Sequence, residues 1–177
     1  SHPRYRRYVC YPAESPFDRS SRFRAHSEPH PCRKTYGMDR QVIDQKLESL
    51  RRCLMRIESK LPIDLNKLES DFDLQDIVSL NLSRAVQMTV DIGAHIISAS
   101  SSPKPETMGQ TFDLLAQLDV LSPELATRLK KSVGFRNIAV HNYDAINWLM
   151  VHSIVKEHLD DFSQFAKAVV IWLEHAD

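Results

Sequence analysis

The sequence predicts an all-α protein, an up-and-down bundle of four to six helices. From residue 38 onward, apolar residues recur at intervals of three and four, which is the period of a helix with one buried face. No segment alternates as a β-strand does, and the chain of 177 residues contains only four glycines. A chain of this length forms one domain, with room for an appendage.

Two long helices are expected in the first half of this domain. Asp39 can cap the first helix, and Pro62 ends it. Its apolar positions are Ile43, Leu47, Leu50, Leu54, Ile57 and Leu61. After a connector over 63–71, the second helix covers about 74–98. Its buried stripe consists of Leu74, Ile77, Val78, Leu82, Ala85, Met88, Ile92, His95 and Ile96. For His95, a hydrogen-bonded position in the core is expected.

Further helices follow a Ser/Pro loop over 100–105. A short third helix covers about 107–118. Ser122 then acts as an N-cap with Pro123 at the first helical position of a fourth helix. Asp144 is expected to cap a fifth helical region, whose apolar positions are Ile146, Leu149, Met150, Ile154 and Val155. Residues 159–174 continue this region or form a sixth helix.

Residues 1–37 show no helical or strand period. They contain five of the nine prolines, and eight Lys or Arg against three acidic residues give them a net charge of +5. The remainder holds 15 basic and 20 acidic residues, a net charge of −5. Two interpretations are open: an irregular basic tail that touches nucleic acid, or a non-native stretch upstream of a start at Met38. We favour the second.

Cysteine usage and hydropathy limit the class of protein. Cys10, Cys32 and Cys53 are widely spaced and form no C-x-x-C pair, so neither a zinc knuckle nor a redox motif is indicated. An odd cysteine count fits a reducing cytoplasm, and no apolar run approaches the length needed to span a bilayer. We therefore expect a soluble cytoplasmic protein without a membrane partner.

The run from Arg136 to Tyr143 carries the chemistry. Arg136 offers a planar cation for phosphate oxygens, and His141 offers an imidazole, which can accept or donate a proton. In an unbroken helix, positions five apart differ by about 140° in azimuth. The two side chains therefore converge only if the helix ends or loosens between them, or if two chains pool their copies. We expect Arg136 in a last helical turn, with His141 and Tyr143 at or just beyond its end.

This run resembles the motif of the HEPN superfamily, Arg, four residues, His, one residue, Tyr. The local form Gly-Phe-Arg-Asn-Ile-Ala-Val-His-Asn-Tyr is similar to its HepT branch, and the resemblance covers about 38–176. It implies a HEPN-like ribonuclease domain over 38–177, with Arg136 and His141 catalytic and Asn137 and Tyr143 supporting. It also implies a homodimer with both motif copies at one cleft.

The resemblance further implies the toxin of a type VII-like toxin–antitoxin system. Such a toxin is a metal-independent RNA endonuclease without a cofactor. Its partner is a small MntA-like nucleotidyltransferase, the antitoxin, which adds AMP to the motif tyrosine. That role falls on Tyr143 here.

Plainer interpretations remain open beside these. Arg136 and His141 suit a helix C-terminus, where cations are favoured. Similarly, Asp71, Asp73 and Asp76 read as first-turn charges rather than metal ligands. His158 and Asp161 have a metal-compatible spacing, yet nothing completes a site. The alternative function is a non-catalytic HEPN-type module that binds a nucleotide or a partner protein.

Overall fold

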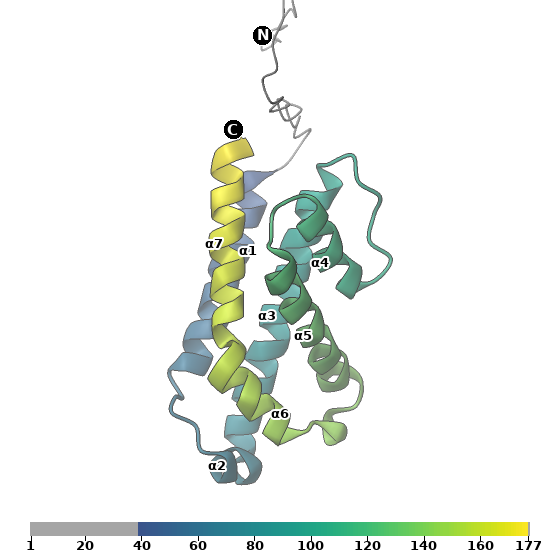
Figure 1. Cartoon of the computed structure of the whole chain (residues 1–177). Helices are drawn as coiled ribbons and strands as arrows, with labels where there is room; N and C mark the ends of the chain where they lie inside the picture. Colours follow the sequence, from purple (N-terminus) through teal and green to yellow (C-terminus); the bar gives the residue numbers. More distant parts are fainter. Residues whose placement is uncertain (1–38, 177) are drawn as a thin grey trace, which may run out of the picture. The chain divides into compact units, whose positions relative to one another are not determined.

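The computed structural model describes residues 39–176, and every regular element in that range is helical (Figure 1). The elements are α1 (Arg40–Glu58), α2 (Leu65–Ser70), α3 (Phe72–Ser98), α4 (Met108–Gln117), α5 (Pro123–His141), the 3-10 turn η1 (Tyr143–Ala145), α6 (Trp148–Ser153), the π-helical turn η2 (Ile154–His158) and α7 (Leu159–Ala176). This confirms the predicted all-α class. The extension over 1–37 lies outside the described residues.

The long helix α3 is the centre of the bundle. It packs against α1, α4 and α5, and α7 packs against α1, α3 and α5 (Figure 1). Fully buried aromatic rings fill the middle of the core at Phe112, Phe162 and Phe165. Burying one such side chain contributes roughly 1.5–3 kcal/mol. The core therefore holds α5, and with it the motif, in a defined position against α3.

Side-chain caps set most helix starts where the sequence predicts them. Asp39 accepts hydrogen bonds from the N–H groups of Gln41 and Val42 at the start of α1. The Thr107 side chain caps α4, and the Ser122 side chain caps α5 ahead of Pro123. Each cap satisfies backbone donors that the first helical turn leaves unpaired.

The predicted cap at Asp144 is wrong. Residues Tyr143–Ala145 form a 3-10 turn, and Ile146 adopts an extended backbone conformation. The next helix therefore begins only at Trp148, where the Asn147 side chain accepts from the Met150 N–H.

From Trp148 the chain stays helical to Ala176, with one π turn over Ile154–His158. Residues 159–174 therefore continue the preceding helix, which is one of the two arrangements that the sequence predicts.

His95 makes a hydrogen bond, as expected, although its side chain is only half-buried. The Asp39 N–H donates to His95 Nε2 over 3.2 Å, which ties the start of α1 to the end of α3. Over the described residues, no helix is both long enough and apolar enough to cross a membrane.

Candidate active site

Helix α5 runs without interruption through the motif and ends at His141. Asn142 leaves the helix with φ −152° and ψ 67°, and its N–H closes the last turn on the Ile138 carbonyl over 2.8 Å. The prediction of Arg136 in a last helical turn is therefore wrong, because more than one turn follows it. His141 and Tyr143 lie at and just beyond the helix end, as expected.

The two catalytic candidates point to different sides of α5. Arg136 precedes Ala139 and Val140 by three and four residues, so all three share the side that faces α3. It is half-buried. His141 lies about 140° away in azimuth, on the exposed side with Asn137. One chain thus presents the guanidinium and the imidazole separately, and no helix break brings them together.

Neither side chain is engaged by the fold. In the part of the chain that the structure describes, Arg136 and His141 have no hydrogen-bonding or ion-pairing partner. The dipole of α5 favours a cation at His141, in the last turn. That plain role does not account for Arg136, which lies further from the helix end. A cation without an acidic partner is available to an anion from outside.

Tyr143 turns back from the end of α5 onto α3. Its hydroxyl donates a hydrogen bond to Asp76 Oδ1 over 2.7 Å. The ring meets the Trp148 ring edge-on, with centroids 6.1 Å apart. About 40% of the residue stays exposed, so the phenol is oriented by its neighbours while an external reagent can still reach it.

A hollow of about 340 Å³ lies beside this phenol. We call it the tyrosine hollow, and its walls are Asp76, Ser79, Leu80, Ser83, Ala139, Val140 and Tyr143. Partial burial raises the pKa of Tyr143, and the hydrogen bond to Asp76 with its negative charge raises it further, while Ser79 acts in the opposite direction. The phenol therefore stays protonated at neutral pH.

Sequence reasoning did not single out Asp76 as a functional residue, because its position in the first turns of α3 suggests only a favourable charge. Asp76 and Tyr143 are 67 residues apart, and only the packing of α3 against α5 makes them neighbours. An acidic residue about seventy positions upstream has no recognisable spacing relative to the motif.

Outside the motif, the histidine and acidic residues of 39–176 do not form a metal site. Asp161 accepts from Arg128 Nε over 2.8 Å, and His158 Nδ1 lies 3.3 Å from its other oxygen. This pair is therefore part of an ion-pair network that joins α5 to the last helices. Within residues 39–176, no three His, Cys, Asp or Glu side chains gather in a way that could hold a metal ion.

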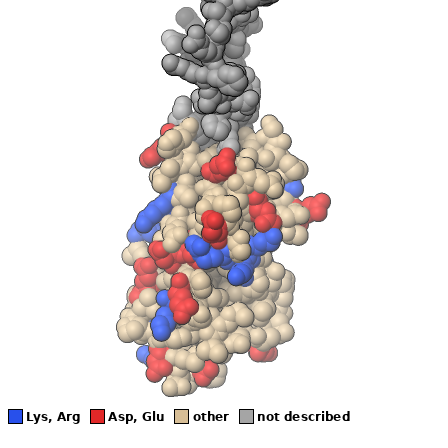
Figure 2. Space-filling model, in the orientation of Figure 1, with Lys and Arg blue, Asp and Glu red and all other residues tan. Residues whose placement is uncertain are grey.

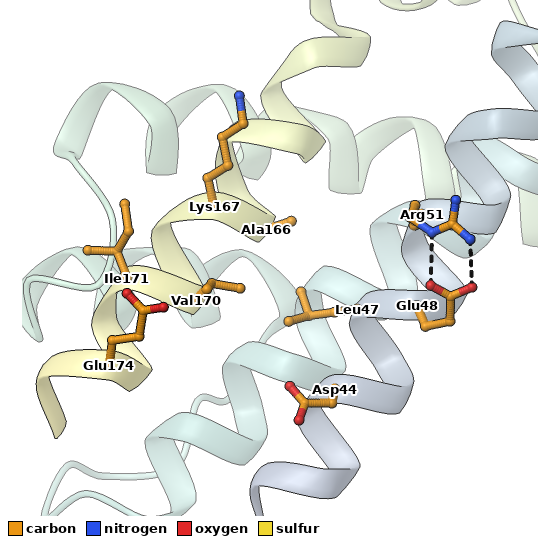
Figure 3. A pocket seen from close by; sticks show the side chains of 9 residues that line it. All are labelled: Asp44, Leu47, Glu48, Arg51, Ala166, Lys167, Val170, Ile171 and Glu174. Atoms are coloured by element: carbon orange, nitrogen blue, oxygen red, sulfur yellow. Dashed lines mark hydrogen bonds and ion pairs between the residues drawn. The ribbon is translucent and has the colours of Figure 1, made fainter. Parts of the chain in front are cut away.

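A larger hollow of about 610 Å³ lies between α1 and α7, away from the motif (Figure 3). Its middle is apolar, with Leu47 and Val170, and charged side chains stand around it. Arg51 is held there by both oxygens of Glu48, at 2.8 Å each. Within the described part of the chain, this hollow is lined by no histidine and by no residue of the motif. Its size alone does not make it a catalytic site.

The charges on the visible face of the molecule are mixed, with acidic and basic side chains interspersed (Figure 2). A surface of this kind attracts a polyanion weakly at long range.

Comparison with known proteins places the chain in a family. The family model described as "Ribonuclease HepT-like" matches residues 50–169, which include the whole motif. The "mRNA nuclease HepT" of Shewanella oneidensis is 38% identical over 128 residues, 72% of this chain and 96% of that protein. The "tRNA nuclease HepT" of Aphanizomenon flos-aquae is 30% identical over 132 residues, 75% of this chain and 90% of that one.

Solved structures agree with this assignment. The tri-AMPylated HEPN toxin of Shewanella oneidensis, solved in complex with its MNT antitoxin, has a TM-score of 0.70 and 37% identity, covering 75% of this chain and 99% of that one. YutE of Bacillus subtilis shares the fold with a TM-score of 0.70 at 18% identity, covering 79% of this chain and 94% of that one. From the family match and the relatives together, we conclude that the chain belongs to the HepT-like ribonucleases of the HEPN superfamily.

Proposed function

We propose that this chain is the toxin of a toxin–antitoxin pair, an RNA endonuclease whose Arg136 and His141 act from opposite subunits of a homodimer. A cognate nucleotidyltransferase neutralises it by adding AMP to Tyr143. The observation that carries the proposal is the unbroken course of α5, which exposes an unpaired guanidinium and an unpaired imidazole on different sides of one helix. Two copies of this helix offer a way to unite them.

Apolar side chains around the motif support pairing of two chains. Val140 is 52% exposed and Leu149 is 59% exposed, and Leu80 and Met150 are also open to solvent. Leu149 and Met150 are apolar positions of the predicted fifth helical region, and in a single chain both remain exposed. Exposed apolar residues gathered around polar functional groups are typical of an interface.

The chemistry uses the nucleophile that RNA carries. His141 of one subunit removes the proton from the ribose 2′-hydroxyl, whose oxygen then attacks the adjacent phosphorus. Arg136 binds the phosphate and the additional charge of its transition state. The same imidazole, now protonated, gives this proton to the departing 5′-oxygen, so each site needs one His141. The products are a 2′,3′-cyclic phosphate and a 5′-hydroxyl end, and Asn137 can orient the imidazole or a phosphate oxygen.

Modification of Tyr143 explains inhibition. The phenol oxygen attacks the α-phosphorus of ATP, pyrophosphate leaves, and the phenol proton passes to Asp76, which already accepts it in a 2.7 Å hydrogen bond. The new phosphodiester carries a negative charge on the side of α5 that also holds Arg136. This phosphodiester binds the guanidinium of Arg136 in place of a substrate phosphate, and its charge repels RNA. The AMP groups on the Shewanella oneidensis toxin support this assignment.

Cleavage by the purified protein tests the catalytic part of the proposal. The unmodified chain should cut RNA in the presence of a chelator, and Arg136→Ala and His141→Ala should each remove this activity. Lys131→Ala is a matched control, because Lys131 is another exposed cation on α5. Undiminished cleavage by both motif variants would contradict the proposal. Nucleotide binding without any cleavage would favour the non-catalytic module.

Tyr143→Phe tests the modification separately. With the nucleotidyltransferase and ATP, the unmutated chain should gain about 329 Da per AMP group, as read by intact mass. Tyr143→Phe should keep its cleavage activity and gain no mass. If the variant is still modified, another residue is the acceptor.

A further inference from the structure

Three arginines converge on a third hollow, between α1 and α3, which the catalytic scheme does not use. Arg52 and Arg56 come from α1, one helical turn apart, and Arg84 comes from α3. The hollow measures about 390 Å³ and has Cys53 and Asn81 among its walls. We call it the arginine hollow.

The charges of these arginines are poorly neutralised. Arg52 lies 3.6 Å from Glu48, but that carboxylate is already held by Arg51 at 2.8 Å. The guanidinium groups of Arg56 and Arg84 form no hydrogen bond or ion pair with any residue in 39–176. Like charges one turn apart on a helix repel each other. Placing these three cations together therefore adds no stability to the fold. A bound anion would offset their mutual repulsion.

The thiol of Cys53 lines the same hollow as the three arginines. Burial raises the pKa of Cys53, and Arg84, Arg56 and Arg52 all lower it, with burial the larger effect. All three guanidiniums are thus close enough to stabilise a negative charge in the hollow.

The arginine hollow and the tyrosine hollow lie on neighbouring sides of α3, about 100° apart in azimuth. Leu80 and Ser83 border the tyrosine hollow, while Asn81 and Arg84, each the next residue along, border the arginine hollow. Leu80, half exposed, lies between them. A helix is about 10 Å across with its side chains, so a short single strand can reach from Tyr143 to the arginines.

We infer that Arg52, Arg56 and Arg84 bind the phosphates of a phosphodiester strand that crosses α3 from the cleavage site. Guanidinium groups suit this ligand because they pair with phosphate oxygens through two parallel hydrogen bonds. The strand has two sources, namely the substrate RNA and the AMP groups attached to Tyr143. The choice of these ligands rests on the proposed function. The domain is acidic overall, so a local cluster supplies the attraction that its net charge does not.

Binding of a single-stranded oligouridylate tests the RNA arm. The full-length chain carrying His141→Ala, which prevents cleavage, is compared with the same chain carrying Arg56→Gln and Arg84→Gln in addition. The dissociation constant is measured over a series of salt concentrations. Loss of two phosphate contacts should weaken binding and reduce the slope of log Kd against log salt by about 1.4. The basic residues of 1–37 contribute equally to both proteins.

Lys67→Gln is the matched control, because Lys67 is an exposed cation on α2 that does not line the arginine hollow. It should leave the slope unchanged. Far-ultraviolet circular dichroism and thermal melting show that each variant is folded. In chains with His141 intact, the Arg56→Gln and Arg84→Gln pair should raise KM for a long RNA with little change in kcat.

Intact mass provides the AMP arm. In the presence of the nucleotidyltransferase, the arginine variants are compared with the parent for the number of AMP groups they accept. A change in RNA binding assigns the site to RNA, and a change in AMP addition alone assigns it to the modifying groups. The inference is wrong if RNA binding and AMP addition are both unchanged. It is also wrong if the variants lose only their binding to the antitoxin. A wild-type chain that cleaves no RNA would contradict the proposed function while leaving the binding comparison valid.

Discussion

Mixing two inactive variants tests whether the active site is shared between subunits. One chain carries Arg136→Ala and the other His141→Ala, and both are allowed to exchange subunits. In the heterodimer, one of the two sites has lost both groups, while the other combines an intact guanidinium with an intact imidazole. We propose this pooling because the two positions lie roughly 140° apart in azimuth on α5.

The expected activity follows from counting sites. Random exchange in an equal mixture makes about half of the dimers heterodimers, and each has one of two sites intact, so activity should recover to about one quarter of the wild-type value. Cleavage of a fluorescent RNA at constant total protein measures this. The unmixed variants give the baseline.

A dominant-negative experiment provides the opposite check. A chain with both substitutions, added in equal amount to the wild-type chain, makes heterodimers in which both sites are broken. It should lower the cleavage by the wild-type chains by about half after exchange. The shared site is refuted if the two single variants recover no activity when mixed and the double variant does not inhibit the wild-type chain. Both groups would then have to act within one chain.

Three further predictions concern the fold and the phenol. Gly93→Ala should lower the free energy of unfolding by about 1–2 kcal/mol in urea titrations, because the new Cβ would lie 2.5 Å from Thr111 Cγ2. Adding Thr111→Ser, which removes that methyl group, should recover part of the loss. If Gly93→Ala is as stable as the parent, the described packing of α3 against α4 is wrong. Phe165→Ala, at a fully buried position, should cost about 3–5 kcal/mol by the same assay. Asp76→Asn should lower the pKa of Tyr143, because it removes the negative charge that favours the neutral phenol. Ultraviolet titration of the phenolate should then show ionisation at a lower pH than in the parent. An unchanged titration would show that Asp76 does not influence the phenol.

Local features were predictable because they depend on neighbours in sequence. The starts of α1, α4 and α5 follow from Asp39, Thr107 and Ser122, whose side chains bond backbone groups two or three residues away. The start of α6 was mispredicted at Asp144, because a 3-10 turn and an extended residue intervene before Asn147. Both acids and amides make good caps, so composition alone does not choose between two such residues three positions apart.

The sequence by itself determined the all-α class, most helix starts and the motif with its family, because period, caps and spacing are local properties. Only the tertiary structure decided that α5 runs unbroken to His141, that Asp76 meets the hydroxyl of Tyr143, and that arginines of α1 and α3 share one hollow. These arrangements depend on how helices far apart in the chain pack together. Packing direction and register are set by the whole core, and no short stretch of sequence encodes them.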